Sequence, residues 1–140
     1  MNKLERFPDW QDRLSTYLDR VRDEPFYWGK HDCALFAAGC VKAITGVDVA
    51  EGVKDSYISK LEAAEYLRQT KRKTLHGAAS MVLGKSVHIA QAGHGDIVRW
   101  NKALGVCVGK FSWFVGEIDG VDQLVSNPTL QCSAAWKVGE

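Results

Sequence analysis

The stretch FYWGKHDCALFAAG, residues 26–39, limits the possible folds of this chain more than any other. Its Trp28-Gly29 pair predicts a turn, because glycine reaches backbone angles that other residues avoid. Asp32 is a favoured N-cap residue, so a helix is expected to begin at Cys33. One apolar stripe follows at helical spacing, made of Phe36, Ala37, Cys40, Val41 and Ile44. Gly46 stands where a glycine commonly ends a helix.

A cysteine at the start of a helix is a candidate nucleophile. The thiol of Cys33 would feel the positive end of the helix dipole. That field lowers the pKa of a thiol and raises its thiolate fraction, and the thiolate is the form that attacks. The position therefore suits covalent catalysis. The alternative is a buried cysteine that acts as a small apolar side chain.

The composition predicts one globular domain, residues 1–140. Of the 140 residues, 46% are hydrophobic and 25% are charged, which is typical of a domain with a single core. The net charge of +1 indicates no nucleic acid or acidic partner. The apolar runs are too short to span a bilayer. The first residues are charged rather than apolar, so we expect no secretory signal and synthesis in a cytoplasm.

The four cysteines predict reduced thiols rather than a disulfide framework. They are Cys33, Cys40, Cys107 and Cys132, and none belongs to a CxxC pair. Disulfide scaffolds are not expected in a chain of this size and composition. We therefore expect no metal and no cofactor, and a zinc site built from cysteines and a histidine is the disfavoured alternative.

Hydrophobic periodicity divides the chain into a helical half, residues 8–84, and a sheet half, residues 85–138. Helices are predicted over about 8–23, from Cys33 to Gly46, from Ser59 with Leu61, Ala64 and Leu67 facing inward, and from Thr74 to Gly84. Strands are predicted over 87–90, 96–100, 105–108, 112–115, 123–125 and 134–138. Helices followed by a curled antiparallel sheet indicate an α+β architecture.

Three motifs resemble those of the NlpC-type cysteine peptidases, which have the papain-like fold. HDCALF, residues 31–36, is similar to their DCSG-like helix start, and GDIVRW, residues 95–100, to their GDLV-like strand. ALGVCVG, residues 103–109, lies where their HVGIY-like strand belongs. Together with the terminal AWKV, residues 135–138, these segments also resemble a family of phage and prophage tail-cluster proteins. That likeness covers most of the chain from Phe26 on.

The resemblance implies that the Cys33 thiolate attacks a peptide carbonyl and that a histidine on the sheet acts as base. In the peptidases this histidine begins the third-motif strand, where the present chain has Ala103-Leu104-Gly105. His31 and His94 are the candidates to replace it. His31 is otherwise a structural cap or surface residue. His94 is otherwise a solvated turn residue, expected at the sheet end away from Ala103.

Other polar and aromatic residues have both a functional and a structural interpretation. Trp28 and Trp100 could line a substrate groove, although tryptophans are more often core residues. Asp32 could contact substrate or orient a partner, although N-capping alone explains it. His76 is expected to be solvated on its helix.

Three functions are compatible with these features. The missing histidine favours a structural or assembly component of a phage tail tip, made in the bacterial host cytoplasm, located in the virion tail and bound to other tail proteins. The second is an active hydrolase that cleaves peptidoglycan with Cys33 as nucleophile and a non-standard base. The third is a non-catalytic module that binds a peptide or a neighbouring tail protein.

Overall fold

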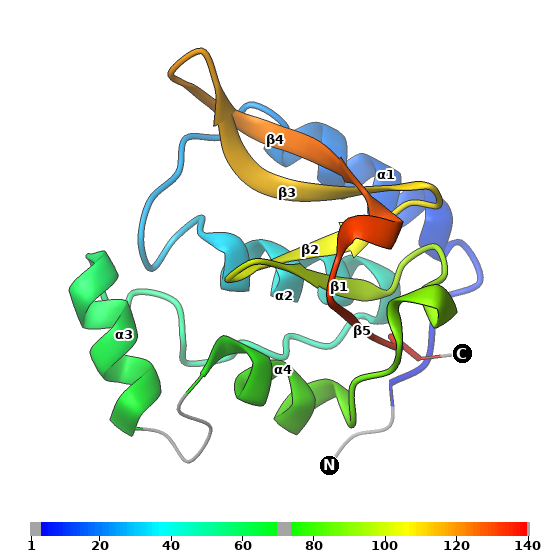
Figure 1. Cartoon of the computed structure of the whole chain (residues 1–140), viewed down its shortest axis with the longest axis horizontal. Coiled ribbons are helices and arrows are strands. Elements are labelled where there is room, and N and C mark those ends of the chain that lie inside the picture. The colour runs from blue at the N-terminus through cyan, green and yellow to red at the C-terminus, as the bar shows by residue number, and fades with distance from the viewer. Residues whose placement is uncertain (1–3, 70–73, 140) are drawn as a thin grey trace.

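The computed structural model describes residues 4–69 and 74–139, and these residues form an α+β fold (Figure 1). The helices are α1 (Trp10–Val21), α2 (Cys33–Thr45), α3 (Lys60–Gln69) and α4 (Leu75–Leu83). The strands are β1 (Ile97–Trp100), β2 (Ala103–Cys107), β3 (Phe111–Ile118), β4 (Val121–Pro128) and β5 (Ala134–Trp136). The predicted α+β class is therefore confirmed.

The strands form one antiparallel sheet in the order β4-β3-β2-β1-β5. Strand β1 pairs with β2 from Ile97 opposite Val106 to Trp100 opposite Ala103, and with β5 along its other edge. Strands β3 and β4 form a long hairpin that projects beyond the rest of the sheet (Figure 1). This topology places β2 in the centre of the sheet, between β3 and β1, where it packs against α2.

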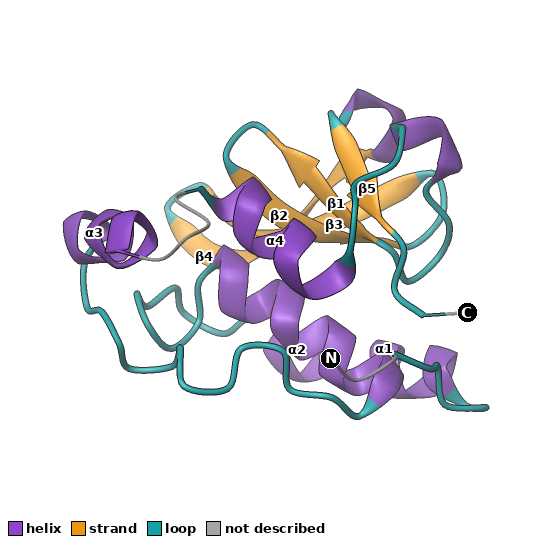
Figure 2. Ribbon diagram, turned by 90° about the horizontal axis from the view of Figure 1, so that it is seen from below, coloured by secondary structure: helices purple, strands orange, loops and turns teal. Residues whose placement is uncertain are grey.

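Helix α2 is the central element of the core. Figure 2 shows α2 and α4 beneath one face of the sheet, α1 on the outer side of α2, and α3 apart from the other helices. The predicted stripe of α2 is buried against strand residues that include Leu104, Val106 and Trp136. Burying each large apolar side chain contributes about 1.5–3 kcal/mol. The glycine expected to end α2, Gly46, has φ 81°, a left-handed conformation that glycine adopts without strain.

The opposite face of the sheet carries a smaller core. Its buried members are Val98, Cys107, Phe114, Cys132 and Ala135. The segment from Val87 to Ala92 packs on this face, and so does Ala103. Strand β1 is thus apolar on both sides, with Ile97 toward α2 and Val98 toward the smaller core.

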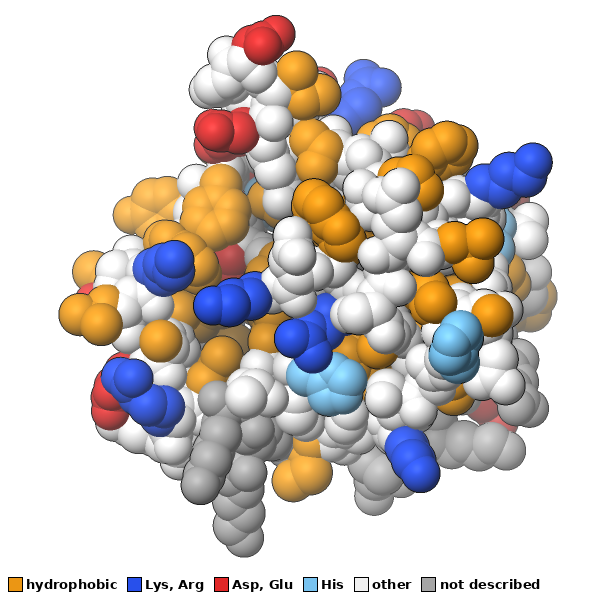
Figure 3. All heavy atoms as spheres, viewed as in Figure 1, with side chains coloured by type: hydrophobic (Ala, Val, Ile, Leu, Met, Phe, Trp, Pro, Cys, Tyr) orange, Lys and Arg blue, Asp and Glu red, His pale blue; other side chains and the backbone are white. Residues whose placement is uncertain are grey.

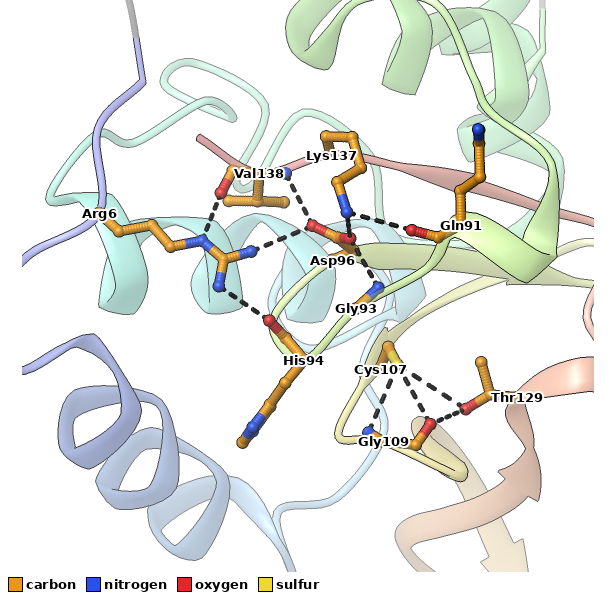
Figure 4. Close-up of polar contacts among 10 residues, drawn as sticks. All are labelled: Arg6, Gln91, Gly93, His94, Asp96, Cys107, Gly109, Thr129, Lys137 and Val138. Atoms are coloured by element: carbon orange, nitrogen blue, oxygen red, sulfur yellow. Dashed lines mark hydrogen bonds and ion pairs between the residues drawn. The ribbon is translucent and has the colours of Figure 1, made fainter. Parts of the chain in front are cut away.

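A buried carboxylate ties both ends of the chain to the start of β1 (Figure 4). Asp96 is fully buried, and its Oδ1 accepts hydrogen bonds from Arg6 Nη2 at 3.1 Å and from the Val138 amide at 3.1 Å. Its Oδ2 lies 2.6 Å from Lys137 Nζ and accepts the Gly93 amide at 2.8 Å. The GD motif therefore serves as an anchor for β1 and for the C-terminal segment.

Two details of the predicted architecture are wrong. Residues 87–90 are not a strand, because Val87 makes only an isolated bridge with Ala135 and residues 89–91 form a 3-10 turn. The inward face predicted for α3 is not buried, since Leu61 is 75% exposed, Ala64 is exposed, and Leu67 is half-buried. Strands β3 and β4 are also longer than the predicted segments. Across the described part of the chain, the helices are too short or too polar to span a bilayer.

Candidate functional site

A tight loop precedes the cysteine helix and fixes its first turn. Tyr27 and His31 exchange two backbone hydrogen bonds, which closes the loop between them. Gly29 inside the loop has φ 81°, and a Cβ there would collide with the carbonyl oxygen of Tyr57. The predicted Trp28-Gly29 turn is therefore confirmed, and glycine is required at its second residue.

The Asp32 carboxylate holds this loop, the helix and a distant tyrosine together. Its Oδ1 accepts the Leu35 amide at 2.9 Å, which confirms the predicted N-cap. Its Oδ2 accepts the Gly29 amide at 3.0 Å and the Tyr57 hydroxyl at 2.7 Å. Burial raises the pKa of the Tyr57 hydroxyl, and its hydrogen bond to the Asp32 carboxylate raises it further. Asp32 is 1% exposed, so these three hydrogen-bond donors replace the water that would otherwise solvate its carboxylate.

The thiol of Cys33 lies at the start of α2 and faces strand β2. The backbone amide of Leu104 donates a hydrogen bond to it, and amides of the first turn of α2 also act on it. Burial nevertheless raises the pKa of the Cys33 thiol, and the Asp32 charge adds to that rise. The expectation of a lowered pKa is thus wrong, because desolvation of the thiolate outweighs the favourable amides.

Leucine occupies the strand position against the thiol. Leu104 points toward α2 and is 5% exposed, whereas the neighbouring Ala103 packs into the smaller core on the other face. The groups that shift the pKa of Cys33 include no imidazole. At this strand position the chain therefore offers the thiol a backbone amide, and the side chain that Leu104 adds to the pocket is a hydrocarbon without a base.

Cys33 lines an apolar pocket of about 550 Å³ between α2, α3, α4 and the central strands. Trp28 and Asp32 line the same pocket, so the structure brings together three of the six predicted site residues. Figure 3 shows basic side chains and a histidine around a hollowed apolar area of this face. Among the described residues, no three histidine, cysteine or acidic side chains cluster as metal ligands would.

The other three predicted site residues lie outside this pocket. His31 is 5% exposed, with Nδ1 3.3 Å from Glu24 Oε2 and its ring against Phe36. The His94 ring packs edge-on against Trp10, 5.1 Å between centroids, near the start of α1. Trp100 lies on the opposite face of the sheet, where its ring centroid is 6.0 Å from that of Phe114 in the smaller core.

The pocket also contains two residues that sequence reasoning missed, His76 and Arg99. His76 is half-buried rather than solvated, and its ring lies 4.8 Å from that of Trp136. Its Nδ1 lies 3.2 Å from Arg99 Nη1. The spacing of His76 to Ala79 and Leu83, three and seven residues later, was a usable signal that His76 shares their inward face.

The contact with Arg99 assigns the proton on His76. A guanidinium can only donate hydrogen bonds, so His76 Nδ1 is the acceptor in this pair. A neutral imidazole that accepts at Nδ1 carries its proton on Nε2. In this arrangement the free nitrogen of His76 is a donor and cannot take the proton of a thiol.

These features define an α+β protein in which a cysteine at a helix start lies against an antiparallel sheet and lines an apolar pocket. The chain matches, over residues 5–138, the family described as Domain of unknown function (DUF6950), and it belongs to that family. Neither the curated proteins nor the solved structures contain a match.

Proposed function

We propose that this protein is a non-catalytic structural or assembly component of a phage tail, with an NlpC-type papain-like fold and a degenerate cysteine site. Two observations support the proposal. The HDCALF, GDIV and LGVCVG segments resemble phage tail-cluster proteins and the NlpC-type peptidases. The cysteine of the first motif begins a helix beside an antiparallel sheet, as the resemblance implies.

The observation that carries the proposal is that the strand residue in contact with the Cys33 thiol is Leu104, whose backbone amide donates to the sulfur and whose apolar side chain lines the same pocket. Without a base, acylation has no acceptor for the thiol proton and no acid for the leaving group, which typically costs about 100- to 10,000-fold in rate. Burial also keeps Cys33 in the thiol form, and the neutral His76 presents N–H rather than a lone pair. All three effects oppose peptide cleavage.

A pH series of thiol alkylation tests this proposal directly. We expect iodoacetamide to modify Cys33 with an apparent pKa above that of a free cysteine, because burial disfavours the thiolate. Mass spectrometry of the Cys33 peptide separates it from the other cysteines. We also expect purified protein to release no more peptide from peptidoglycan than Cys33→Ser does. Fast labelling at neutral pH together with Cys33-dependent release would overturn the proposal.

Restoring an imidazole at the strand position is expected to activate the thiol. In Leu104→His the new side chain would replace a hydrocarbon that lines the Cys33 pocket and would stabilise the thiolate, so alkylation at pH 7 should accelerate by roughly tenfold. Leu104→Gln is the matched control, because it adds polarity without a titratable group. Equal rates in the two variants would show that Leu104 does not occupy the position of a base. Circular dichroism checks that both variants are folded.

A second candidate function is an active cell-wall hydrolase with Cys33 as nucleophile. The observation that favours it is that His76 lines the same pocket as Cys33. This function requires His76 to exchange its Arg99 contact for the other tautomer, with Nε2 as acceptor. Peptidoglycan release that is lost in both Cys33→Ser and His76→Gln, and retained in His88→Gln on the exposed 3-10 turn, would establish it.

A further inference from the structure

The pocket beside Cys33 combines an apolar wall with a basic edge. Its wall is formed by small and branched aliphatic side chains of α2 and α4, including Ala37, Val41, Ala78 and Val82. Its volume of about 550 Å³ lies in the range of sites that enclose small organic molecules. A wall of this kind favours a hydrocarbon over a sugar or a polar peptide, because it offers few hydrogen-bonding groups.

Three basic side chains line this pocket, Lys60 of α3, Arg99 of β1 and Lys102 of the β1–β2 turn. Among the described residues, the ion pairs involve other cations, and none of these three pairs with a carboxylate. Arg99 donates from Nε to the Asn101 carbonyl and contacts His76 Nδ1 through Nη1, and these contacts hold the guanidinium in place. Its other N–H groups have no hydrogen-bond partner among the described residues. The edge can therefore receive an anion.

No acidic group among the described residues that line the pocket neutralises these cations. Asp32 is the one carboxylate among the described lining residues, and its oxygens are occupied by Gly29, Leu35 and Tyr57. The pocket therefore has a positive edge and an apolar interior. The complementary ligand has a hydrocarbon body and a single anionic end.

We propose that this pocket binds a fatty acid, with the hydrocarbon chain between α2 and α4 and the carboxylate at Arg99 and Lys102. The inference deepens the proposed function, since a site that does not cleave peptides can hold a ligand without turnover. Arg99 supplies a charge-assisted hydrogen bond of fixed direction. The exposed Lys102 adds attraction that weakens with salt.

Calorimetric titration of the whole protein with decanoate tests this proposal. We expect one site, with octanoate bound about tenfold more weakly because two fewer methylenes are buried. Decyltrimethylammonium has the same chain with a cationic end and should bind at least about tenfold more weakly than decanoate. NMR shifts of the Val82, Leu83 and Leu104 methyl groups locate the ligand in the pocket.

Charge-removing variants test the basic edge. Arg99→Gln should weaken decanoate binding by roughly tenfold, and Lys102→Gln should weaken it less and reduce its salt dependence. Because Arg99 is half-buried, the exposed Lys102 provides a second variant that leaves the interior untouched. Arg22→Gln is the matched control, since this exposed arginine lies outside the pocket. Unchanged affinity in both pocket variants would overturn the proposal.

Two further results would also overturn it. Equal affinity for decanoate and decyltrimethylammonium would indicate non-specific, detergent-like binding. Tighter binding of a peptide with an apolar C-terminal residue would indicate that the pocket binds the C-terminus of a protein. The proposed function is tested separately by peptidoglycan release. Absence of decanoate binding without Cys33-dependent release removes only the fatty acid, whereas Cys33-dependent release removes the non-catalytic function itself.

Discussion

Asp96→Asn is expected to destabilise the protein by about 3 kcal/mol, because it removes the charge from a buried carboxylate that two cations and two amides contact. The Asn amide group would place an NH2 donor at one of the two former oxygen positions, where it would meet other donors and could accept no hydrogen bond. Arg6, whose side chain is 15% exposed, would lose its charged partner. A loss of this size corresponds to a fall of about 10 °C in the unfolding midpoint, measurable by calorimetry.

The matched control is Asp9→Asn, the same substitution at the surface. Asp9 and Arg13 form an ion pair with side chains 53% and 51% exposed, so its removal should leave the unfolding midpoint unchanged. Arg6→Gln should destabilise less than Asp96→Asn, since Lys137 and both amides remain on the carboxylate. If the Asp96 and Asp9 variants unfolded at the same temperature, the buried carboxylate would not be the anchor described above.

The helix boundaries could be predicted from the sequence because their signals are local. Asp32 and Thr74 accept amides of their own helices, and Gly46 and Gly84 follow the last helical residues. The prediction of a strand over 87–90 is wrong because the alternation of apolar residues in this segment arises from packing on the smaller core. Only Val87 pairs with another segment, through an isolated bridge to Ala135. The alternation of apolar and polar residues indicates which side chains are buried, whereas the pairing of a strand depends on residues far away in the sequence.

The candidate site was only partly predictable for the same reason. The place of Cys33 at the helix start follows from Asp32, a neighbour in sequence. The raised pKa of Cys33 depends on burial by elements far along the chain, and the residue beside its sulfur depends on the register of β2. The helical spacing of His76 to Ala79 indicates its inward face, but the pocket that this face borders also depends on α2, α3 and the central strands, which local periodicity does not reveal.

Asp32→Ala is expected to destabilise the protein by about 3–7 kcal/mol. The variant loses the N-cap of α2, which costs about 1 kcal/mol. It also leaves the buried Gly29 amide and Tyr57 hydroxyl without an acceptor, at about 1–3 kcal/mol for each. Chemical denaturation of the variant measures the sum.

A double-mutant cycle separates these contributions. Tyr57→Phe removes the hydroxyl that donates a hydrogen bond to Asp32. In this background Asp32→Ala should therefore lower the free energy of unfolding by about 1 kcal/mol less than in the wild type. Additive losses would show that the tyrosine contact contributes nothing to stability. Thr74→Ala on α4 is the control for an N-cap alone, because among the described residues its side chain accepts a hydrogen bond from the Gly77 amide and from no other group.

Asp32→Asn tests how the same residue acts on the thiol. The amide can retain the cap to Leu35, whereas the charge that raises the pKa of Cys33 is gone. Alkylation of Cys33 should therefore have a lower apparent pKa in Asp32→Asn than in the wild type, although burial still holds it above that of a free thiol. An unchanged pH profile would mean that desolvation alone raises the pKa of the Cys33 thiol. Asp32 would then stabilise the loop and the helix without affecting the reactivity of the thiol.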